Sequence, residues 1–531
     1  MTEPVRFTID GRPAEAEPGV SLLAALWNDG ARALRSSVTG EARGPLCGMG
    51  TCFECRVTVD GQPHVRSCLT PVRHGMNVGL RTASLPVETT STKASPPGAS
   101  PSVDAPQRTE SVEPLEAQVV VVGGGPAGLA AAVHAAEAGA RTLLVDTYTQ
   151  PGGQIWRHSV APPIAAKHWI ARFVRARVAP FVGATVVDAV AGELLVEHEG
   201  RPRRVRFDRL VLATGARELF LPFPGWTLPG VVGVGGAQAM FKARARFTGQ
   251  RVVVAGSGPL LVAVAAVLAK EGARLVGLAE QAPLGRLTAF AAGLWRTPRK
   301  IAEGLGYGWC LAGVPCRAGA WVREVEEKGG TLRATLTDGR RTWTWDCDVL
   351  ACGYGLVPNL ELARLLGCET AGDRVVLDAA QQTSVPGIFA AGELGGIAGV
   401  DHALVTGAVA GLAAAGRPIS AALAHRRAAE LAFGARLSRA FALRDELRAL
   451  ARPDTPVCRC EDVAHSRFET VASAREAKLA TRAGMGPCQG RVCGPALAFL
   501  RGWPEDTIRP PLFPTPLAVI EDGLGDDRGQ A

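Results

Sequence analysis

Aromatic residues are scarce in this chain, and its basic charge is not concentrated in any one segment. Phe, Trp and Tyr make up 5% of the 531 residues, and only 3 are Tyr. The net charge of +8 comes from 58 basic residues that are spread along the chain. Nucleic-acid binding needs a basic patch and, for single strands, aromatic side chains that stack on bases. We therefore expect no nucleic-acid partner.

A secretion signal and a membrane span are also missing from the sequence pattern. The first residues, MTEPVRFTID, contain no basic region followed by an apolar stretch. The longest apolar run, Val252–Ala269, is interrupted by Gly-Ser-Gly-Pro, which favours a buried strand, turn and helix over a transmembrane helix. We expect a cytoplasmic protein. Thiols stay reduced there, so the 13 cysteines favour metal ligation over disulfide bonds.

Five of the cysteines lack the spacing of a redox-active pair. They are Cys310, Cys316, Cys347, Cys352 and Cys368. None of them forms a C-x-x-C or C-x4-C pair, which a flavin-dependent disulfide reductase would need beside its flavin. We interpret them as small buried apolar side chains, and we do not expect disulfide exchange.

The other eight cysteines form two quartets, one near each end of the chain. The first is a C-x4-C-x2-C-x12-C run of Cys47, Cys52, Cys55 and Cys68. Soft thiolate ligands suit iron, and four of them hold a [2Fe–2S] cluster. The short spacing matches the plant-type ferredoxin pattern, with glycines inside the loop that let backbone amides turn toward the cluster. Four thiolates also make a structural zinc site, which is the alternative.

The second quartet is a C-x-C-x27-C-x4-C run of Cys458, Cys460, Cys488 and Cys493. Its segments VCRCEDV and TRAGMGPCQGRVCG resemble the bacterioferritin-associated ferredoxin type of [2Fe–2S] domain. The resemblance implies that a helix pair returns the C-x4-C loop to the C-x-C loop. Zinc is again the alternative ligand.

The segment that carries the first quartet has the pattern of a small mixed domain. Val5–Ile9 alternates in polarity and ends at Asp10-Gly11, a hairpin dipeptide, and Ser21 precedes a helix-like run. A second Asp-Gly pair, Asp60-Gly61, turns the chain back toward Cys68. We predict a β-grasp ferredoxin fold. The Ser-, Thr- and Pro-rich residues that follow predict a flexible linker on which this domain moves.

From Glu116 the sequence alternates strands and helices, which predicts a parallel sheet. A short apolar strand runs into Gly123-x-Gly125-x-x-Gly128 and an Ala-rich helix, and the next strand ends in Asp146. Glycine permits the tight turn and the approach of a pyrophosphate to the helix N-terminus. The acid that closes the second strand is placed to accept hydrogen bonds from a ribose. We predict a dinucleotide site at this turn.

Two later segments indicate that this dinucleotide is FAD. Thr214-Gly215 follows an apolar strand, and Gly392-Glu393 follows another and precedes a helix that begins near Asp401. Here the chain resembles the two-dinucleotide-domain (glutathione-reductase-like) flavoproteins. In that family Gly-Asp stands at the second place and its carboxylate holds the ribityl chain of the flavin, whereas this chain has Glu393.

A second turn has the sequence Gly256-x-Gly258-x-x-Leu261, and Glu280 ends the strand that follows its helix. It resembles the NAD-type domain inserted in the same flavoproteins. Leu261 replaces the third glycine, which crowds the contact between helix and strand. An NAD(P) site, an adenine-nucleotide site and a purely structural turn all remain open.

Taken together, these patterns predict a multidomain α/β protein. The segments are 1–82, a β-grasp [2Fe–2S] ferredoxin; 83–115, a linker; 116–230 with 350–416, an FAD domain; 231–349, an NAD(P)-type domain; 417–452, a helical connector; 453–510, a second [2Fe–2S] module; and 511–531, a tail. In the connector, the Arg-, Ala- and Leu-rich stretch Ala422–Arg452 predicts a helix whose core contacts include Leu431, Leu437, Phe441 and Leu447.

Motifs over nearly the whole chain resemble one family. They are RGPLCGMGTCFECRVTVDG, PFPGWTLPGV (Pro222–Val231), GSGPLL, CGYGLVPN (Cys352–Asn359), AAGELGGIAGVDHAL and CRCEDV. The chain resembles a fusion of the small ferredoxin and FAD-containing subunits of hydrogen cyanide synthase, the opine oxidases and the bacterial D-hydroxyproline or proline dehydrogenases. It is also similar to the α subunit of sarcosine oxidase without its folate-binding domain.

This resemblance implies an FAD- and iron–sulfur-containing electron-transfer subunit. In the family, an FAD-containing β-type subunit oxidises the amine or amino acid, some complexes hold an additional FMN between subunits, and electrons leave to a respiratory, quinone-linked acceptor. It implies a complex that is peripheral to the inner membrane. No catalytic residue is assigned. The alternatives are a self-contained NAD(P)H-dependent ferredoxin-type reductase and a non-catalytic iron–sulfur protein for iron handling or redox sensing.

Overall fold

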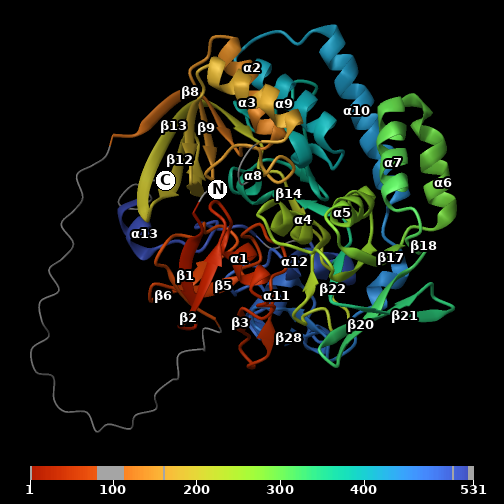
Figure 1. The fold of residues 1–531 in the computed structure, drawn as a ribbon. Helices are drawn as coiled ribbons and strands as arrows, with labels where there is room; N and C mark the ends of the chain where they lie inside the picture. The colour runs from red at the N-terminus through yellow and green to blue at the C-terminus, as the bar shows by residue number, and fades with distance from the viewer. Residues whose placement is uncertain (1–2, 81–112, 159–161, 505–506, 524–531) are drawn as a thin grey trace, which may run out of the picture.

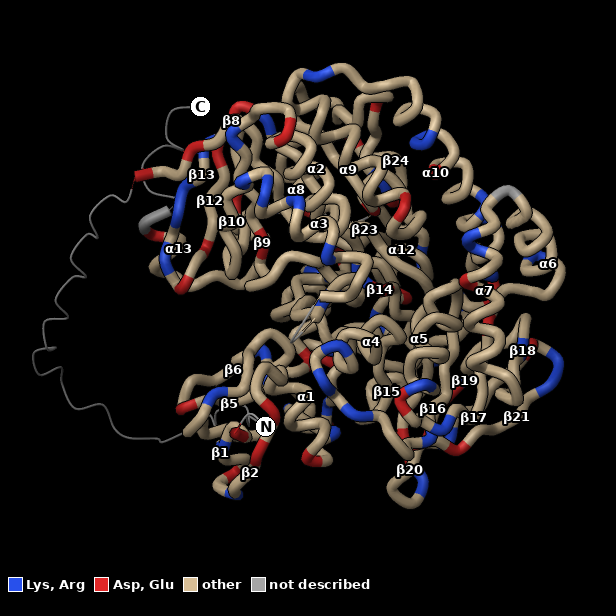
Figure 2. Tube along the Cα trace, turned by 45° about the horizontal axis from the view of Figure 1, so that its top comes forward, with Lys and Arg blue, Asp and Glu red and all other residues tan. Residues whose placement is uncertain are grey.

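The structure is a computed structural model that describes residues 3–80, 113–158, 162–504 and 507–523. Most of the predicted linker, residues 83–112, and the end of the predicted tail lie outside the described residues. Figure 1 shows the N-terminal strands in red and, in orange to yellow, a second sheet that α2, α3 and α9 cover. Lys and Arg are interspersed with Asp and Glu over the described elements (Figure 2).

The helices begin and end as follows. They are α1 Leu22–Asn28, α2 Pro126–Glu137, α3 Ile164–Arg175, α4 Val234–Lys242, α5 Pro259–Lys270, α6 Leu284–Gly293, α7 Pro298–Cys310, α8 Glu361–Leu365, α9 Val400–Ala414, α10 Ala421–Ala440, α11 Ala474–Thr481, α12 Cys493–Arg501 and α13 Leu517–Gly523, with short 3-10 turns η2 Gly392–Gly395, η3 Asp445–Ala449 and η4 His465–Phe468. In the part of the chain that the structure describes, no helix is long and apolar enough to span a bilayer.

The N-terminal sheet has the strand order β2-β1-β7-β5-β6. Its strands are β1 Val5–Ile9, β2 Arg12–Ala16, β5 Arg56–Val59, β6 Gln62–Arg66 and β7 Asn77–Gly79. Both predicted Asp-Gly hairpins form, with Asp10, Gly11, Asp60 and Gly61 all at positive φ, as a type I′ turn requires. The Ser21 hydroxyl caps α1 by accepting a hydrogen bond from the Ala24 N–H at 3.2 Å. The parallel pair β1–β7 in an otherwise antiparallel sheet confirms the β-grasp fold.

The first nucleotide-type sheet runs β10-β9-β8-β13-β12-β11, and β26 pairs with β13. Its strands are β8 Leu115–Val122, β9 Thr142–Asp146, β10 Ala179–Val182, β11 Ala184–Val190, β12 Glu193–His198, β13 Arg201–Leu212 and β26 Ile388–Ala390. Strands β10, β9, β8, β13 and β26 are parallel, as predicted from the alternating pattern. Their carboxyl ends therefore share one edge, where α2 and α9 also begin.

The second nucleotide-type sheet, β15-β22-β16-β17-β18, is entirely parallel. Its strands are β15 Val231–Val232, β16 Arg251–Gly256, β17 Arg274–Glu280, β18 Cys316–Ala318 and β22 Val349–Gly353. An antiparallel sheet of β19 Trp321–Lys328, β20 Thr331–Thr337 and β21 Thr342–Cys347 packs against it. The apolar run Val252–Ala269 forms strand β16, a turn and helix α5, so it is buried core as predicted.

Short two-stranded pairs complete the molecule. They are β3 Arg35–Ser36 with β4 Ala42–Arg43, β14 Ala216–Glu218 with β23 Leu356–Pro358, β24 Thr370–Ala371 with β25 Arg374–Val375, and β27 Pro456–Cys458 with β28 Val463–Ala464. The connector differs from the expectation, because α10 stops at Ala440 and the chain continues as a loop and η3. Leu447 is fully buried on η3, as expected of a core contact, whereas Leu431 is exposed.

Two glycines bring α2 and α9 into close contact. A Cβ added to Gly407 would lie 2.2 Å from the Ala127 carbonyl oxygen, and one added to Gly411 would lie 2.2 Å from the Ala131 carbonyl oxygen. The backbones thus touch where a side chain would separate them. Because α2 follows the first glycine turn, this contact also holds that turn in place.

We predict that Gly407→Ala lowers the thermal unfolding midpoint. The added methyl group meets backbone, which cannot rotate away, and such overpacking costs about 1–3 kcal/mol. Gly304→Ala in α7 is the matched control, because nothing lies within 4 Å of its added Cβ and alanine favours a helix. Differential scanning fluorimetry compares the two variants, and equal midpoints would contradict the packing argument.

Candidate redox sites

The first glycine turn joins β8 to α2 at the carboxyl edge of the parallel sheet. Gly123 has φ +106°, and a Cβ added to it would lie 2.2 Å from the Ala213 carbonyl oxygen. A Cβ on Gly128 would lie 1.7 Å from the Gly123 carbonyl oxygen. A Cβ added to Gly125, the N-cap of α2, would meet only the Gly153 Cα, at an ordinary contact distance of 3.9 Å. The first and third glycines therefore close the turn, and the middle one leaves room for a ligand at the helix N-terminus.

Asp146 ends β9 beside this turn. Its carboxylate accepts hydrogen bonds from the Gly124 N–H at 2.8 Å and the Tyr148 N–H at 3.1 Å. Burial raises the pKa of Asp146 to about 6, and these backbone donors partly offset that effect. The structure thus brings the predicted acid to the predicted turn, where a carboxylate can bind a ribose diol.

The two later flavin segments converge on the same edge. Thr214 follows β13, and its hydroxyl donates to the Asn359 carbonyl oxygen at 2.8 Å. Gly392 follows β26, and its N–H donates to the Thr406 hydroxyl at 2.9 Å. A Cβ on Gly392 would lie 2.8 Å from the Ala127 side chain, which explains the glycine at the approach to α2.

Gly215 and Glu393 complete this group. Gly215 accepts a hydrogen bond from the Asn359 N–H at 2.9 Å, and its φ of +68° fits glycine. Glu393 accepts a hydrogen bond from the Ala398 N–H at 3.2 Å, and burial raises its pKa to about 7. Asn359 and Thr406 support the site but carry no local motif that marks them as cofactor-site residues.

These features fit a flavin adenine dinucleotide. Glycines leave the backbone of the turn open, the N-terminus of α2 is available for the pyrophosphate, and Asp146 is placed for the ribose. The N-terminus of α9, with Gly399 as its N-cap, starts at the same edge and supplies a positive helix end.

The second glycine turn repeats the arrangement of the first. The Gly258 N–H donates to the Glu280 carboxylate at 2.7 Å, as the Gly124 N–H does to Asp146. Burial raises the pKa of Glu280 to about 7. A Cβ on Gly256 would lie 1.7 Å from the Gly353 carbonyl oxygen. Leu261 is 1% exposed and packs in the core, so the sheet accommodates the larger residue in place of the third glycine.

A segment from elsewhere in the chain lies against this second turn. The Ser257 hydroxyl donates to the Phe441 carbonyl oxygen at 3.2 Å, and the Gln281 side chain donates to Ser257 at 2.9 Å. The Arg286 guanidinium donates to the Ala442 carbonyl oxygen at 3.0 Å. The loop after α10 therefore contacts the turn where a dinucleotide would approach.

The four cysteines of the first quartet are buried and lie in two pairs. The Cys47 thiol contacts Cys52, and the Cys55 thiol contacts Cys68. Burial alone would raise the pKa of Cys47, but hydrogen bonds from Cys52 and Thr51 lower it to about 5. The Met49 N–H also points at the Cys47 sulfur, at 3.3 Å.

The loop conformation explains the glycines inside this quartet. Gly48 and Gly50 both have positive φ, which lets backbone N–H groups face inward. A Cβ on Gly48 would lie 3.0 Å from the Gly236 carbonyl oxygen. The cysteine loop therefore packs closely on α4 of the second nucleotide-type fold.

The second quartet is paired in the same way. Cys458, at the end of β27, contacts Cys493, the first residue of α12, and Cys460 contacts Cys488. All four are buried. Hydrogen bonds from Cys493 and from neighbouring backbone N–H groups lower the pKa of Cys458 to about 6, although burial raises it. The C-x4-C loop thus returns to the C-x-C loop, as the ferredoxin resemblance implies.

Two pairs per quartet suit two irons better than one zinc. In a [2Fe–2S] cluster each iron takes two of the four thiolates, whereas a zinc site needs all four around one point. The pairing therefore fits two [2Fe–2S] clusters.

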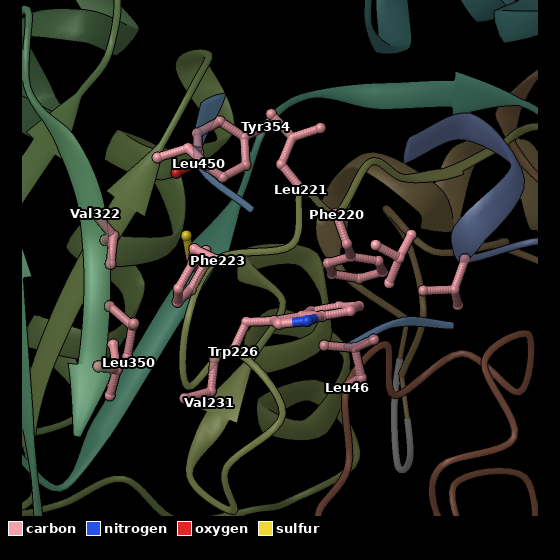
Figure 3. Close-up of a cluster of buried hydrophobic side chains, with 14 of the residues drawn as sticks. Leu46, Phe220, Leu221, Phe223, Trp226, Val231, Val322, Leu350, Tyr354 and Leu450 are labelled. Atoms are coloured by element: carbon pink, nitrogen blue, oxygen red, sulfur yellow. The ribbon is translucent and has the colours of Figure 1, made fainter. Parts of the chain in front are cut away.

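The Pro222–Val231 loop connects the flavoprotein core to both quartets. Phe220, Phe223 and Trp226 pack with Leu46, the residue before Cys47 (Figure 3). The Trp226 indole N–H donates to the Pro456 carbonyl oxygen at 2.6 Å, two residues before Cys458. This role is not visible in the sequence, where the motif indicates only the family.

Comparisons with known proteins agree with this architecture. A family model for pyridine nucleotide-disulphide oxidoreductases matches residues 117–410, and one for a 2Fe-2S iron-sulfur cluster binding domain matches residues 2–83. The second quartet lies beyond both matches, so the identity of its module stays a prediction.

Curated relatives and a solved structure extend the comparison. The HcnB subunit of hydrogen cyanide synthase from Pseudomonas aeruginosa is 33% identical over 70% of this chain and 90% of its own length. An opine oxidase subunit of Rhizobium meliloti is 33% identical over 76% of this chain and 98% of its own length. The crystal structure of L-proline dehydrogenase from P. horikoshii has the same fold, with a TM-score of 0.67, 18% identity and 98% coverage of both chains.

We predict that Asp146→Asn weakens FAD binding about tenfold or more. A hydrogen bond to a charged group contributes about 1.5–3 kcal/mol, and about 1.4 kcal/mol corresponds to a factor of ten. Asp208→Asn, on the exposed part of β13, is the control. FAD retained per chain after dilution and gel filtration measures the effect. If both variants retained FAD equally, Asp146 would not be an FAD-binding residue.

We predict that Cys52→Ser and Cys488→Ser each lower the bound iron to about half, because each removes one of two [2Fe–2S] ligand sets. Cys316→Ser is the control, since Cys316 is exposed and outside both quartets. Iron, zinc and acid-labile sulfide are measured per chain. Zinc in place of iron and acid-labile sulfide would show that a quartet binds zinc and not a [2Fe–2S] cluster.

Proposed function

Because the chain belongs to the pyridine nucleotide-disulphide oxidoreductase family and is homologous to HcnB and to opine oxidase subunits, we propose that it relays electrons within an amine or amino acid dehydrogenase complex. It is an FAD-dependent oxidoreductase with an N-terminal 2Fe-2S ferredoxin domain. The proposal concerns its substrate class, its second cluster, its partner and its acceptor.

The observation that carries the proposal is the Pro222–Val231 loop. It joins the flavoprotein core to the segments that bear both cysteine quartets, through Leu46 on one side and Pro456 on the other. A flavin takes two electrons from an oxidised C–H bond beside nitrogen, and iron–sulfur sites carry electrons singly. In this proposal the chain combines one site for electron pairs with two sites for single electrons in one packed unit.

The partner of this chain is an FAD-containing, β-type dehydrogenase subunit that oxidises the substrate. The substrates of the family suggest an opine, glycine, proline or hydroxyproline. An FMN between the subunits and a respiratory, quinone-linked acceptor complete the path. We place the complex in the cytoplasm, at the inner membrane, where such an acceptor lies.

The competing function is a self-contained NAD(P)H-dependent reductase that uses Gly256, Gly258 and Glu280. The hydrogen bond from Gly258 to Glu280 favours a nucleotide-type turn there. The contact between Ser257 and the Phe441 carbonyl oxygen weighs against a nicotinamide dinucleotide, because the loop occupies the approach to the turn. Because an adenine nucleotide would approach the same turn, we propose that the second turn serves the fold.

We predict that the purified chain reduces a dye with an amine or amino acid only when the partner flavoprotein is added. The substrate is oxidised on the partner, so the chain alone supplies no electrons. Dye reduction is measured with opines, glycine, proline and hydroxyproline, with and without a candidate partner flavoprotein. Full activity of the chain alone would contradict the relay, and rapid anaerobic bleaching of its flavin by NADH would favour the competing reductase.

A further inference from the structure

We propose that Glu54 is a positioning residue that holds the two cysteine quartets against each other as one fixed unit. Electrons then pass between the two sites without any movement of the N-terminal domain. The inference rests on the proposed function, in that both quartets hold clusters. It replaces the sequence-based expectation that this domain moves on its linker.

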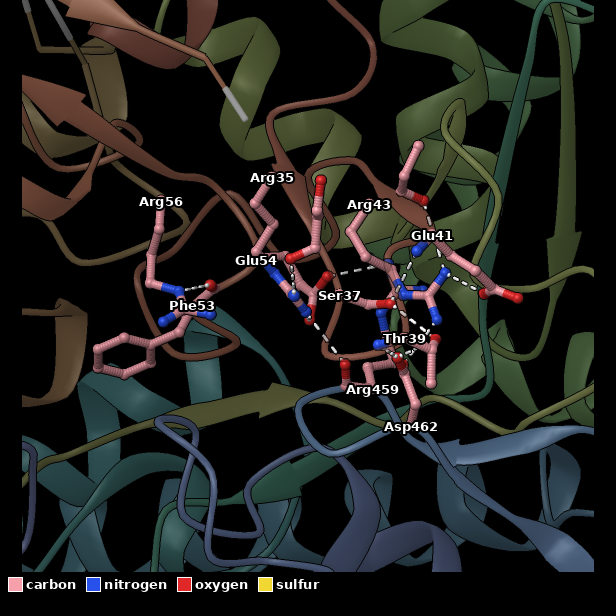
Figure 4. A network of polar contacts seen from close by, with 12 residues as sticks. Arg35, Ser37, Thr39, Glu41, Arg43, Phe53, Glu54, Arg56, Arg459 and Asp462 are labelled. Atoms are coloured by element: carbon pink, nitrogen blue, oxygen red, sulfur yellow. Dashed lines mark hydrogen bonds and ion pairs between the residues drawn. The ribbon is translucent and has the colours of Figure 1, made fainter. Parts of the chain in front are cut away.

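The carboxylate of Glu54 lies between two guanidinium groups. Its Oε1 accepts from Arg35 Nη2 at 2.9 Å, and its Oε2 accepts from Arg459 Nη2 at 3.2 Å (Figure 4). The three side chains are 1–3% exposed. Arg35 Nη2 also donates to the Arg459 carbonyl oxygen at 3.0 Å. A buried, doubly paired carboxylate therefore stands at the contact of two modules that are about 400 residues apart in sequence.

The positions of these residues tie the contact to the two quartets. Glu54 lies between Cys52 and Cys55, and Arg459 lies between Cys458 and Cys460. One ion pair therefore joins the cysteine loop of the first quartet to the C-x-C loop of the second. The Arg459 guanidinium also donates to the Trp226 carbonyl oxygen at 2.9 Å, which fixes the same loop to the flavoprotein core.

A second set of contacts lies beside the first. Asp462, two residues after Cys460, accepts from Arg43 Nη2 at 2.7 Å and from the Thr39 hydroxyl at 2.7 Å (Figure 4). The Thr39 N–H donates to the same carboxylate at 3.1 Å. Arg43 and Asp462 are 2% and 5% exposed. The two modules thus meet through two independent ion pairs, both shielded from water.

Burial decides whether this contact opens during turnover. Removing one partner of a buried ion pair leaves an uncompensated charge, so separation requires three desolvated groups at the Glu54 contact to be rehydrated together. Exposed pairs, by contrast, form and break with little change in free energy. A domain that moved in every cycle would be expected to use exposed pairs. The geometry points to a permanently docked domain.

The electron step then stays inside the chain. One site loses a single electron and the other gains it, and no bond or proton moves. The electrons come from the amine through the partner flavoprotein and leave to the acceptor of the complex. Glu54 takes no part in the redox change. Its role is to hold the two cysteine loops in a fixed position relative to each other.

The test measures the magnetic interaction between the two clusters by EPR. When the full-length chain is fully reduced, both clusters are paramagnetic, and we expect splitting and faster spin relaxation that a half-reduced sample lacks. Glu54→Gln removes the carboxylate charge and is expected to weaken the interaction, because the Arg43–Asp462 contact remains. Glu41→Gln is the matched control, because Glu41 pairs with Arg43 at 2.7 Å in the same region but is 61% exposed. It should keep the interaction unchanged.

Iron and sulfide are counted in every sample, so that loss of a cluster is not taken for loss of docking. If Glu54→Gln loses iron, Arg35→Met, on β3 and away from both cysteine loops, replaces it and should weaken the interaction with both clusters retained. Two full clusters that never interact in the unaltered chain would overturn the docking and leave the relay function standing. An unchanged interaction in a fully loaded Glu54→Gln or Arg35→Met variant would also overturn the role of the triad. A chain that binds only one cluster would refute the proposed function itself.

Discussion

The buried carboxylate of Glu54 is the interaction on which the arrangement of this molecule depends. Burial raises the pKa of the Glu54 carboxyl group, but Arg459 and Arg35 lower it by more. The pKa is therefore below its ordinary value, and the carboxylate stays ionised between the two guanidinium groups. Truncating one member of such a buried group costs about 3–5 kcal/mol, because the remaining charges lose their partner. Together with the packing of Leu46 against Trp226, this contact makes the N-terminal domain, the flavoprotein core and the C-terminal module one body.

The flavoprotein core contains two glycine turns of similar structure, and the two turns have different surroundings. In both turns a glycine N–H donates to the acid at the end of the second strand, Asp146 in one and Glu280 in the other. The first turn adds the segments around Thr214 and Gly392, which meet it at the same edge of the sheet. The second turn instead receives the loop at Phe441. The two turns differ at the third glycine, which is Leu261 in the second turn, and in the segments that surround them.

Local motifs were predictable from the sequence because their residues are close neighbours in the chain. The Asp10-Gly11 hairpin, the Gly123 turn and the Cys47–Cys55 loop each depend on a few consecutive residues, and each has the predicted structure. The pair of Glu54 and Arg459 was not predictable, since nothing local marks either residue as the partner of the other. The end of α10 was also missed, because Phe441 leaves the helix to pack against Phe290 at a ring distance of 5.5 Å, which is a tertiary contact.

A docked ferredoxin domain changes what the linker has to do. If contacts such as that of Arg43 with Asp462 hold the domain, its position depends on complementary side chains and not on the length or composition of the connecting residues. The same contacts would hold the two modules together without a covalent connection. Two separate chains with these side chains would meet in the same way, and the linker only raises their effective concentration. The relative position of the two modules is therefore set by the buried contacts, and the connecting chain makes those contacts intramolecular.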